Sequence, residues 1–468
     1  MTVQIDEELL QKLKDYDQTH VLKYWDSLTD DEKQQLLSQL RSVSFDTLKK
    51  AIKQSKCGDS LSQELLHPPD QDIVSSIKNL TADTVRDLKI QGLRAIANGE
   101  VGFIILAGGQ GTRLNTPYPK GMFDIGLLSG KTLFQLQAEQ LIRIKQLSSS
   151  SGMKCNSIPW YIMTSEHTLK DTADFFESHN YFNYPKEDVV MFEQNHLPSL
   201  HFNGKIALIE KGKIGIAPDG NGGLFSVLKS TKMLDDMRSR GIKYLHVCGV
   251  DNILNRILDP VFIGVSLKNQ ADCSLKVVKK TRWNEALGIV SSKIDPENSS
   301  LYFCHGNICN HFFTLEFLEI IAKNYCDQMK FHIAKKKMKC IDLENAITIQ
   351  PDSPNVMKFE KFIFDVVPFS KNFHVLEVKR EKEFSPLKNA LPNPDESPIS
   401  CIRDLKNLHM EWLRKVGVVF DCDDKHIEIS PLVSYEGENL EKLKEITFPK
   451  KALIELINGQ IQVINKEN

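Results

Sequence analysis

A glycine-rich run with two nearby cations is the part of this sequence best suited to chemistry. It reads Leu106-Ala-Gly-Gly-Gln-Gly-Thr-Arg-Leu114, and Tyr118-Pro-Lys-Gly-Met122 follows it. The apolar run Val101–Leu106 predicts a short buried strand just before the glycines. Glycines past a strand let the backbone approach a ligand, and their N–H groups can face phosphate oxygens. Arg113 and Lys120 add positive charge, so the run predicts a polyphosphate site.

Two common glycine loops fit this run less well. The phosphate loop of NTPases ends in Gly-Lys-Ser/Thr, whereas this run ends in Gly-Thr-Arg. The dinucleotide fingerprint needs a G-x-G-x-x-G spacing and an acidic residue about 20 positions later. Here the spacing is G-G-x-G, and the nearby acids Asp124 and Glu139 do not end a strand-like run. A bare turn is the remaining alternative, and the cations beside the glycines argue against it.

Three later segments also carry residues suited to chemistry. Ala217–Leu224 reads APDGNGGL, a loop that can admit a flat base or a sugar, with a plain helix-entry loop as the alternative. Asp251 follows the predicted strand Tyr244–Val250, where a carboxylate can hold Mg²⁺ against phosphate oxygens; a turn or cap residue is the alternative. Lys358 and Lys388 are candidate cations, although a lone lysine is more often a solvated surface residue.

A cluster of soft ligands lies near residue 305. Cys304, His305, Cys309 and His311 are residue types that bind zinc. Their spacing matches no standard zinc site, and the region has the pattern of a strand. We therefore predict no zinc site here.

Composition narrows the class of protein. The chain has 468 residues, a formal net charge of −2 and 41% hydrophobic residues, which is ordinary for a soluble globular protein of two or three domains. Without a global basic field, nucleic acid and anionic membranes are not expected partners. The sequence shows neither a secretory signal nor an apolar run of membrane-spanning length. Ten scattered cysteines without a C-x-x-C pair predict reduced thiols and a cytoplasmic protein.

Strand and helix patterns alternate over the middle of the chain. Residues 1–97 are typical of charged amphipathic helices, and residues 98–389 of a catalytic α/β domain. Residues 390–468 are typical of a small C-terminal domain with a helix over Ile399–Leu413 and short strands over Val416–Asp421 and Ile427–Ile429. The alternation predicts βαβ units around a mainly parallel sheet, with ligands beyond the C-terminal strand ends. The predicted strands are Val101–Leu106, Trp160–Thr164, Val189–Phe192, Tyr244–Val250 and Ala271–Val278. The predicted helices are Thr132–Leu147, Leu169–Phe176, Leu224–Arg238 and Phe317–Tyr325.

An ordered set of motifs resembles the eukaryotic UDP-N-acetylhexosamine pyrophosphorylases, also called UDP-N-acetylglucosamine diphosphorylases. The motifs are LAGGQGTRL with YPKGM, KTLFQLQAEQ (131–140), APDGNGGL, VDNIL (250–254), GNICNHFF (306–313), FEKFIFD (359–365), EFSPLKNA (383–390) and ISPLVSY (429–435). Each motif alone is weak evidence. Their order across nearly the whole chain makes the resemblance specific.

The resemblance implies both a fold and a reaction. The fold is α/β: a Rossmann-like nucleotide-diphospho-sugar transferase domain between an N-terminal helical layer and a small C-terminal α+β domain. The reaction is uridylyl transfer from UTP to N-acetylglucosamine 1-phosphate, with Mg²⁺ or Mn²⁺ and release of pyrophosphate. N-acetylgalactosamine 1-phosphate is left open as a second acceptor. A divergent, weakly active or non-catalytic nucleotide-binding paralogue is the alternative, and monomer and homodimer are both left open.

The resemblance also implies which residues bind the substrates. By position they are Leu106, Ala107, Gly108, Gly109, Lys120, Gln194, Gly220, Asn221, Asp251, Asn307, Lys358 and Lys388. The glycine run would hold the uridine nucleotide, Gln194 and the loop at Gly220 and Asn221 the base and its surroundings, and Asn307 the sugar. Asp251 would serve the metal.

Elementary chemistry suits these roles. The attacking sugar phosphate is already ionised, so the protein has to bring two anions together and stabilise the leaving group. We expect Arg113 and Lys120 to act on the leaving pyrophosphate, and Lys388 and Lys358 on the incoming phosphate. Arg113, Lys120 and Lys388 are therefore the predicted catalytic residues.

The chain departs from the family on the sugar side. Family members carry a longer segment before Gly306-Asn307, with a Glu-Tyr-Ser-Glu-like run that contacts the sugar. Residues 291–305 of this chain contain no such run, and Cys304-His305 stands where the family has Asn-Ala. The nucleotide half is mostly intact, so the sequence predicts a uridine nucleotide and leaves the sugar undecided.

Overall fold

Two compact units make up the computed structural model, which describes residues 3–56, 70–149, 155, 157–282, 285, 304–422 and 424–467. Unit 1 contains Met1–Leu66, Gln194–Ser230 and Ile321–Pro368, and unit 2 contains His67–Glu193, Thr231–Ile320 and Phe369–Asn468. Both units are discontinuous in sequence. The division into continuous regions 1–97, 98–389 and 390–468 stays a prediction.

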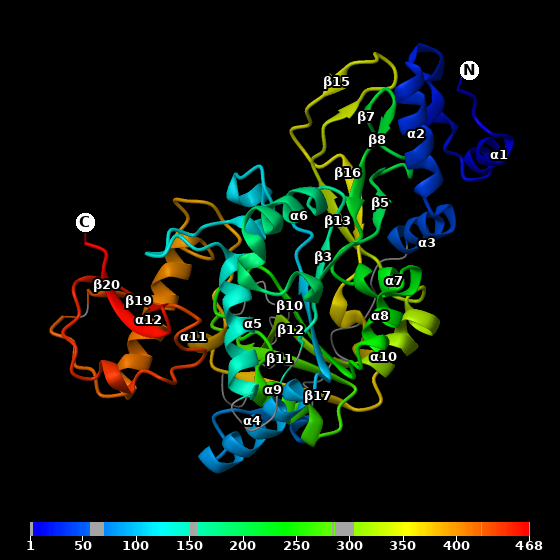
Figure 1. Ribbon diagram of the computed structural model, residues 1–468. Coiled ribbons are helices and arrows are strands. Elements are labelled where there is room, and N and C mark those ends of the chain that lie inside the picture. Colours follow the sequence, from blue (N-terminus) through cyan, green and yellow to red (C-terminus); the bar gives the residue numbers. More distant parts are fainter. Residues whose placement is uncertain are drawn as a thin grey trace. The chain divides into compact units, whose positions relative to one another are not determined.

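Unit 2 is built around one eight-stranded sheet (Figure 1). Its strand order is β1-β17-β11-β12-β10-β2-β3-β4, and β12 alone among these strands runs antiparallel to its neighbours. The strands are β1 Val74–Ser76, β2 Val101–Leu106, β3 Trp160–Thr164, β4 Val189–Glu193, β10 Tyr244–Gly249, β11 Cys273–Lys279, β12 His305–Thr314 and β17 Phe373–Val378. The predicted mainly parallel α/β sheet is confirmed.

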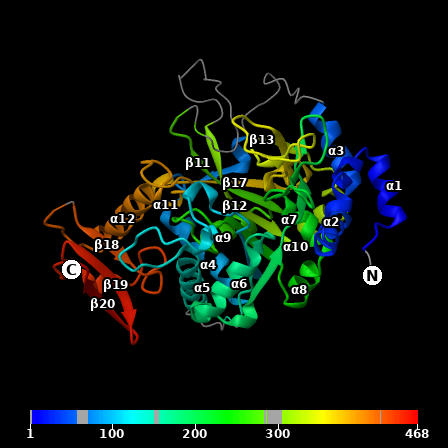
Figure 2. The same cartoon turned by 90° about the horizontal axis from the view of Figure 1, so that it is seen from above.

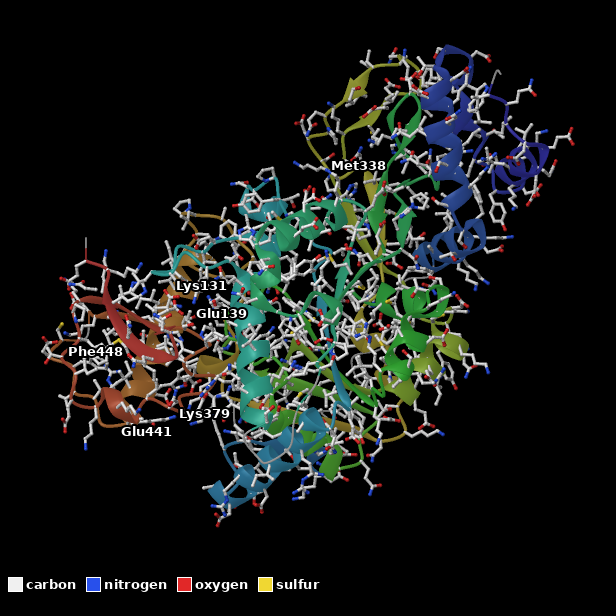
Figure 3. All side chains as sticks on the ribbon, in the orientation of Figure 1. Lys131, Glu139, Met338, Lys379, Glu441 and Phe448 are labelled. Carbon is white, nitrogen blue, oxygen red and sulfur yellow. The ribbon has the colours of Figure 1, made fainter. Side chains whose placement is uncertain are left out.

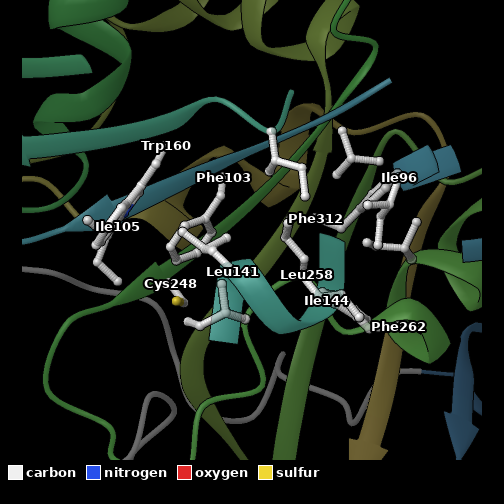
Figure 4. Packing of buried hydrophobic residues seen from close by; sticks show 14 of the residues in the cluster. Ile96, Phe103, Ile105, Leu141, Ile144, Trp160, Cys248, Leu258, Phe262 and Phe312 are labelled. Carbon is white, nitrogen blue, oxygen red and sulfur yellow. The ribbon is translucent and has the colours of Figure 1, made fainter. Parts of the chain in front are cut away.

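Helices cover the sheet of unit 2 and bury its apolar side chains. They are α4 Ala82–Ala97, α5 Leu133–Ser149, α6 Leu169–Ser178, α8 Met233–Ser239, α9 Pro260–Lys268, α10 Leu315–Ile320 and the short α11 Arg380–Glu383. Strand alternation turns Phe103 and Ile105 of β2 to one face, where they share a core cluster with Leu141 of α5 and Phe262 of α9 (Figure 4). All four are fully buried.

Glycine lets α4 and α9 pack closely. A Cβ at Gly92 would lie 2.0 Å from Pro260 O, and one at Gly264 would lie 2.0 Å from Leu88 O. The two helices lie side by side (Figure 1). Any larger residue at either glycine would push the helices apart.

The C-terminal part of unit 2 contains a helix and three strands (Figure 2): α12 Pro398–Lys415, β18 His426–Ile429, β19 Lys451–Ile457 and β20 Gln460–Asn465. A buried ion pair joins Lys131 Nζ to Glu139 Oε2 at 2.9 Å (Figure 3). Lys131 Nζ also lies 3.0 Å from Glu455 Oε1 of β19. The predicted strand over Val416–Asp421 is wrong, because Gly417 turns the chain at φ +95° directly after α12.

Unit 1 contains the first three helices of the region predicted to be helical, together with short sheets, whereas α4 of that region belongs to unit 2. Its helices are α1 Glu7–Asp15, α2 Asp30–Ser42, α3 Phe45–Lys56 and α7 Gly223–Ser230. Its strands are β5 His196–Pro198, β6 Leu200–His201, β7 Leu208–Glu210, β8 Lys213–Ile214, β9 Ile216–Pro218, β13 His332–Lys336, β14 Cys340–Ile341, β15 Thr348–Ile349 and β16 Val356–Glu360. Thr29 starts α2 with a capping box to Glu32.

Two predicted helices are interrupted. The predicted helix Leu224–Arg238 is in fact α7 and α8, which belong to different units. The predicted helix Phe317–Tyr325 is α10 followed by the π-helical turn Ile321–Tyr325. No helix in the described part of the chain is long and apolar enough to cross a membrane.

Candidate functional site

The glycine run begins where β2 ends in unit 2. The carbonyl oxygen of Gly108 accepts a hydrogen bond from Ser165 Oγ at 3.0 Å, which anchors the start of the loop. Gly111 adopts φ +67°, and a Cβ there would lie 2.8 Å from Thr116 Oγ1. At Gly109 the nearest atom to a Cβ is Lys120 Cδ at 3.9 Å, so the backbone there has open space beside it. The loop thus combines a fixed turn with an accessible backbone.

Asp251 lies at the same end of the sheet. β10 runs parallel to β2 with Gly249 opposite Leu106, so both strands end at one edge. Lys120 Nζ donates to Asp251 Oδ2 at 3.0 Å and to Leu387 O at 3.1 Å. We call Leu106–Gly111, Lys120, Asp251 and Leu387 the β2–β10 edge. The structure thus brings together the glycine run, a cation and a carboxylate.

Asn252 connects the two segments that meet at this edge. Its Oδ1 accepts from Ser385 N at 2.8 Å, and its Nδ2 donates to Glu383 O at 2.7 Å. Leu387 N also donates to Asp251 O at 2.7 Å. Because the amide of Asn252 is 95% buried and makes bonds in both directions, it holds the two segments in register. Sequence reasoning missed this residue, although it belongs to the VDNIL motif.

A buried charge cluster supports the same segment. Lys276 Nζ, on β11, lies 2.5 Å from both Asp259 Oδ2 and Glu383 Oε2, and its side chain is fully buried. Burial by itself lowers the pKa of Lys276, but the two carboxylates outweigh it and raise that pKa. A lysine in an apolar strand gives no sign of such partners, so the sequence could not have predicted this cluster.

Arg113 and Lys388 flank the edge. Arg113 is exposed, and its carbonyl oxygen accepts from Ala390 N at 3.1 Å. Lys388 Nζ forms an ion pair with Glu396 Oε1 at 2.9 Å, and the two side chains are 28% and 39% exposed. The glycine run and the segment carrying Lys388 are therefore in direct contact, while Lys388 is neutralised by a carboxylate that the sequence did not indicate.

Asn307 lies on β12, in the same sheet. Its Oδ1 accepts from Cys309 N at 2.8 Å, and Cys309 has φ +55°. The divergent segment 291–305 lies outside the described residues except for Cys304 and His305. Two observations concern the cluster of Cys and His residues near residue 305. Burial lowers the pKa of His311 to about 3. Among the described residues, no three His, Cys, Asp or Glu side chains form a group that could hold a metal ion.

In unit 1, a second glycine loop precedes α7. Gly220 adopts φ +87°, and a Cβ there would lie 2.4 Å from Lys361 O. Lys361 O also accepts from Gly222 N at 2.9 Å, and Lys361 N donates to Asp219 O at 2.7 Å. These bonds clamp Asp219–Gly222, which we call the 219–222 loop, against the chain directly after β16.

The other predicted residues of unit 1 belong to the same surroundings. Asn221 Oδ1 accepts from Ile363 N at 3.0 Å. Lys358 lies on β16 opposite Ala334, and burial lowers the pKa of its ammonium. Gln194 is buried and directly follows β4. The structure therefore locates Asn221, Lys358 and Gln194 within unit 1.

Asp219 is the charged residue of this loop. Its carboxylate is 3% exposed, and its Oδ1 has no hydrogen-bond partner among the described residues. Burial raises the pKa of Asp219 from 3.8 to about 7, against the nearby charge of Lys361. The sequence offered no sign of this shift.

Known proteins resemble this chain over almost its whole length. The family profile described as UTP–glucose-1-phosphate uridylyltransferase matches residues 43–301. UDP-N-acetylhexosamine pyrophosphorylase-like protein 1 of Homo sapiens is 40% identical, over 93% of this chain and 94% of that protein. The chain belongs to the UDP-N-acetylhexosamine pyrophosphorylase family of uridylyltransferases.

Two further members of this family agree with the assignment. UDP-N-acetylglucosamine pyrophosphorylase of Saccharomyces cerevisiae is 36% identical, over 93% of this chain and 97% of that protein. The crystal structure of the Trypanosoma brucei UDP-N-acetylglucosamine pyrophosphorylase in complex with an inhibitor is 27% identical, with a TM-score of 0.81 over 97% of this chain and 99% of that one. The predicted family and fold are confirmed.

Proposed function

We propose that this chain is a UDP-N-acetylglucosamine diphosphorylase. It would transfer the uridylyl group of UTP to N-acetylglucosamine 1-phosphate and release pyrophosphate. The observation that carries the proposal is the β2–β10 edge, where an open glycine backbone, Lys120 and Asp251 meet at the C-terminal ends of parallel strands. Ligands of α/β sheets bind at such ends, and the relative from Saccharomyces cerevisiae is named UDP-N-acetylglucosamine pyrophosphorylase.

Lys120 has the contacts expected of a phosphate-binding lysine. An ammonium carries three N–H donors, and the described residues accept two of them, Asp251 Oδ2 and Leu387 O. The third donor, or the one released from Asp251, would bind an oxygen of the leaving pyrophosphate. Charge on that group grows as the α-phosphorus–oxygen bond breaks, and a positioned cation stabilises it more in the transition state than before.

Lys388 and Arg113 would complete the set of cations. The Lys388–Glu396 pair is partly exposed, and such pairs contribute little, so Lys388 can exchange Glu396 for the incoming sugar phosphate at small cost. Arg113 is exposed beside the glycine run, where its planar guanidinium can bind two phosphate oxygens at once. By the resemblance alone, Lys358 would be a further phosphate contact.

Mg²⁺, or Mn²⁺ in its place, fits the single carboxylate of Asp251. Such ions are held by one or two carboxylates together with substrate phosphates rather than by an all-protein cage. Asp251 is 31% exposed, so an oxygen is accessible beside the glycine run. When bound, the ion would draw negative charge from the phosphate oxygens, while Asn252 keeps Asp251 in place.

The remaining substrate contacts are proposed from the loop geometry and the resemblance. By the resemblance, Gly220, Asn221 and Gln194 would contact the base and its surroundings, and Asn307 would contact the sugar. The nine described cysteines that are free thiols support a reducing, cytoplasmic compartment.

A pyrophosphate-release assay tests the activity. With UTP and Mg²⁺, we expect turnover with N-acetylglucosamine 1-phosphate, and parallel reactions with N-acetylgalactosamine 1-phosphate and glucose 1-phosphate define the sugar. Lys170→Ala, a lysine whose side chain is 87% exposed, is the matched control for loss of a lysine. UTP binding without pyrophosphate release for any sugar 1-phosphate would show a non-catalytic paralogue instead.

A further inference from the structure

Three polar side chains of unit 2 form a relay that uridylyl transfer does not use. Cys304 directly precedes β12, and its Sγ lies 3.9 Å from Nδ1 of His305. The other ring nitrogen of His305, Nε2, lies 2.9 Å from Glu377 Oε2 on β17. The imidazole therefore contacts the sulfur through one ring nitrogen and the carboxylate through the other.

The carboxylate end of this relay is fixed. Glu377 is 6% exposed, and its Oε1 accepts from Ser76 Oγ of β1 at 2.9 Å. Lys279 of β11 is the other charge facing it, with Nζ 3.8 Å from Glu377 Oε2. A nucleophile, a base and a group that orients the base are the parts of an activated cysteine site.

Electrostatics in this cluster favour the charged pair. The hydrogen bond to His305 lowers the pKa of the Cys304 thiol and Lys279 lowers it further, which outweighs the opposing effects of burial and of the Glu377 charge. The same contact with Cys304, together with Glu377, raises the pKa of His305. Both shifts move the proton from sulfur to imidazole, which increases the share of thiolate at neutral pH.

Seven other described cysteines have the opposite environment. Burial raises the pKa of six thiols, those of Cys155, Cys248, Cys273, Cys326, Cys340 and Cys401. Cys422 is exposed, but its contact with Asp424 raises its pKa. Among these thiols, the most exposed one is therefore not the one beside a base. Cys422 is more exposed than Cys304, but Cys304 has His305 as a neighbouring base.

We propose that Cys304 is a modification site, a nucleophilic thiol with His305 as its proton acceptor and Glu377 as the orienting group, which reacts with small electrophiles such as hydrogen peroxide. His305 Nδ1 takes the thiol proton, and the sulfur attacks one peroxide oxygen. A sulfur–oxygen bond forms, the oxygen–oxygen bond breaks, and the leaving hydroxide takes the proton from His305 to become water. Sulfur is oxidised to a sulfenic acid, and peroxide is reduced.

Alkylation kinetics test this site on the full chain. The protein is treated with iodoacetamide at neutral pH, where the sulfur–carbon bond forms and iodide leaves, and each cysteine is followed by peptide mass spectrometry. We expect Cys304 to react about fivefold or more faster than Cys422 in the folded protein, and both to react alike in concentrated guanidinium chloride. When the protein is treated with hydrogen peroxide and then with dimedone, which labels sulfenic acids, Cys304 should again be labelled in preference to Cys422.

Variants separate the relay from exposure. His305→Gln and Glu377→Gln should each reduce labelling of Cys304 to the rate of Cys422, while His179→Gln, an exposed histidine elsewhere in unit 2, should leave it unchanged. The proposal is overturned if Cys422 reacts as fast as Cys304 in the folded wild type, or if Glu377→Gln has no effect. The folded-against-unfolded comparison needs no variant, so it decides even if His305→Gln fails to fold.

Discussion

The β2–β10 edge and the 219–222 loop are both glycine-rich, but their glycines serve different purposes. At the edge, a Cβ on Gly109 would meet its nearest atom only at 3.9 Å, so the missing side chain leaves room for a ligand. In the loop, a Cβ on Gly220 or Gly222 would lie within 2.4 Å or 2.7 Å of the backbone of residues 361–362. There the missing side chain lets the protein pack against itself. We therefore expect the edge to act on a ligand through charge beside an open backbone, whereas the glycines of the loop serve close packing within the protein.

The sharpest test of this contrast removes charge from the edge. Lys120→Ala and Arg113→Ala should each lower turnover about a hundredfold or more, about 3 kcal/mol of transition-state stabilisation, because each removes a cation from the leaving pyrophosphate. Steady-state kinetics on purified protein with a wild-type circular dichroism spectrum measures the effect. Near-normal turnover in either folded variant would remove that residue from the mechanism.

Alanine substitutions at Gly220 of the loop and at Gly109 of the edge test this difference directly. Gly220→Ala should lower the free energy of unfolding by about 2 kcal/mol or more, since it strains a φ of +87° and forces a Cβ against Lys361 O. Gly109→Ala should leave stability unchanged and raise the KM for UTP about tenfold, because it fills space meant for the ligand. Denaturant titration and kinetics are both needed.

Gly99→Ala is the matched control for the backbone strain. Gly99 has φ +71° and no atom within 4 Å of a Cβ position, so its alanine variant carries the strain of a positive φ without a clash. Equal losses of stability in Gly99→Ala and Gly220→Ala would show that the close approach to Lys361 contributes nothing.

The buried carboxyl of the 219–222 loop predicts a pH dependence of stability. The pKa of Asp219 in the folded protein, about 7, lies above its ordinary 3.8, so the folded state binds more protons than the unfolded state between these values. Stability should therefore fall as pH rises from about 4 to about 7. Asp219→Asn should remove this dependence and gain roughly 2 kcal/mol relative to wild type between pH 5 and pH 8. Melting temperatures across that range measure it, and parallel curves would contradict the assignment.

The smallest expected effect concerns the partly exposed pair beside the edge. Glu396→Gln frees Lys388 from its carboxylate and should lower the KM for the sugar 1-phosphate by about threefold or less, because such pairs contribute below about 1 kcal/mol. The difference from wild type should shrink as salt is raised, since screening weakens both interactions. A change that persists in high salt would show that Glu396 acts through structure.

Local sequence patterns predict much of the fold, and they predict the strand and the carboxylate that belong to the β2–β10 edge. The apolar run Val101–Leu106 forms β2 with the predicted bounds, and Asp251 does follow β10. The predictions failed where distant contacts decide the local conformation. Leu224–Arg238 has a continuous helical pattern but divides into α7 and α8, and Val416–Asp421 has the composition of a strand but turns at Gly417.

The sequence by itself determined the family, the parallel sheet, the position of the glycine run and the candidate cations, because these depend on spacing over a few residues and on the order of motifs. Only the tertiary structure decided which residues pair with the charged side chains. Lys120 meets Asp251 across 131 positions and Leu387 across 267, and Lys276 finds two buried carboxylates. Such pairings depend on which strand ends share an edge, and each charge is tolerated at its depth only because the fold brings its partner within hydrogen-bond distance.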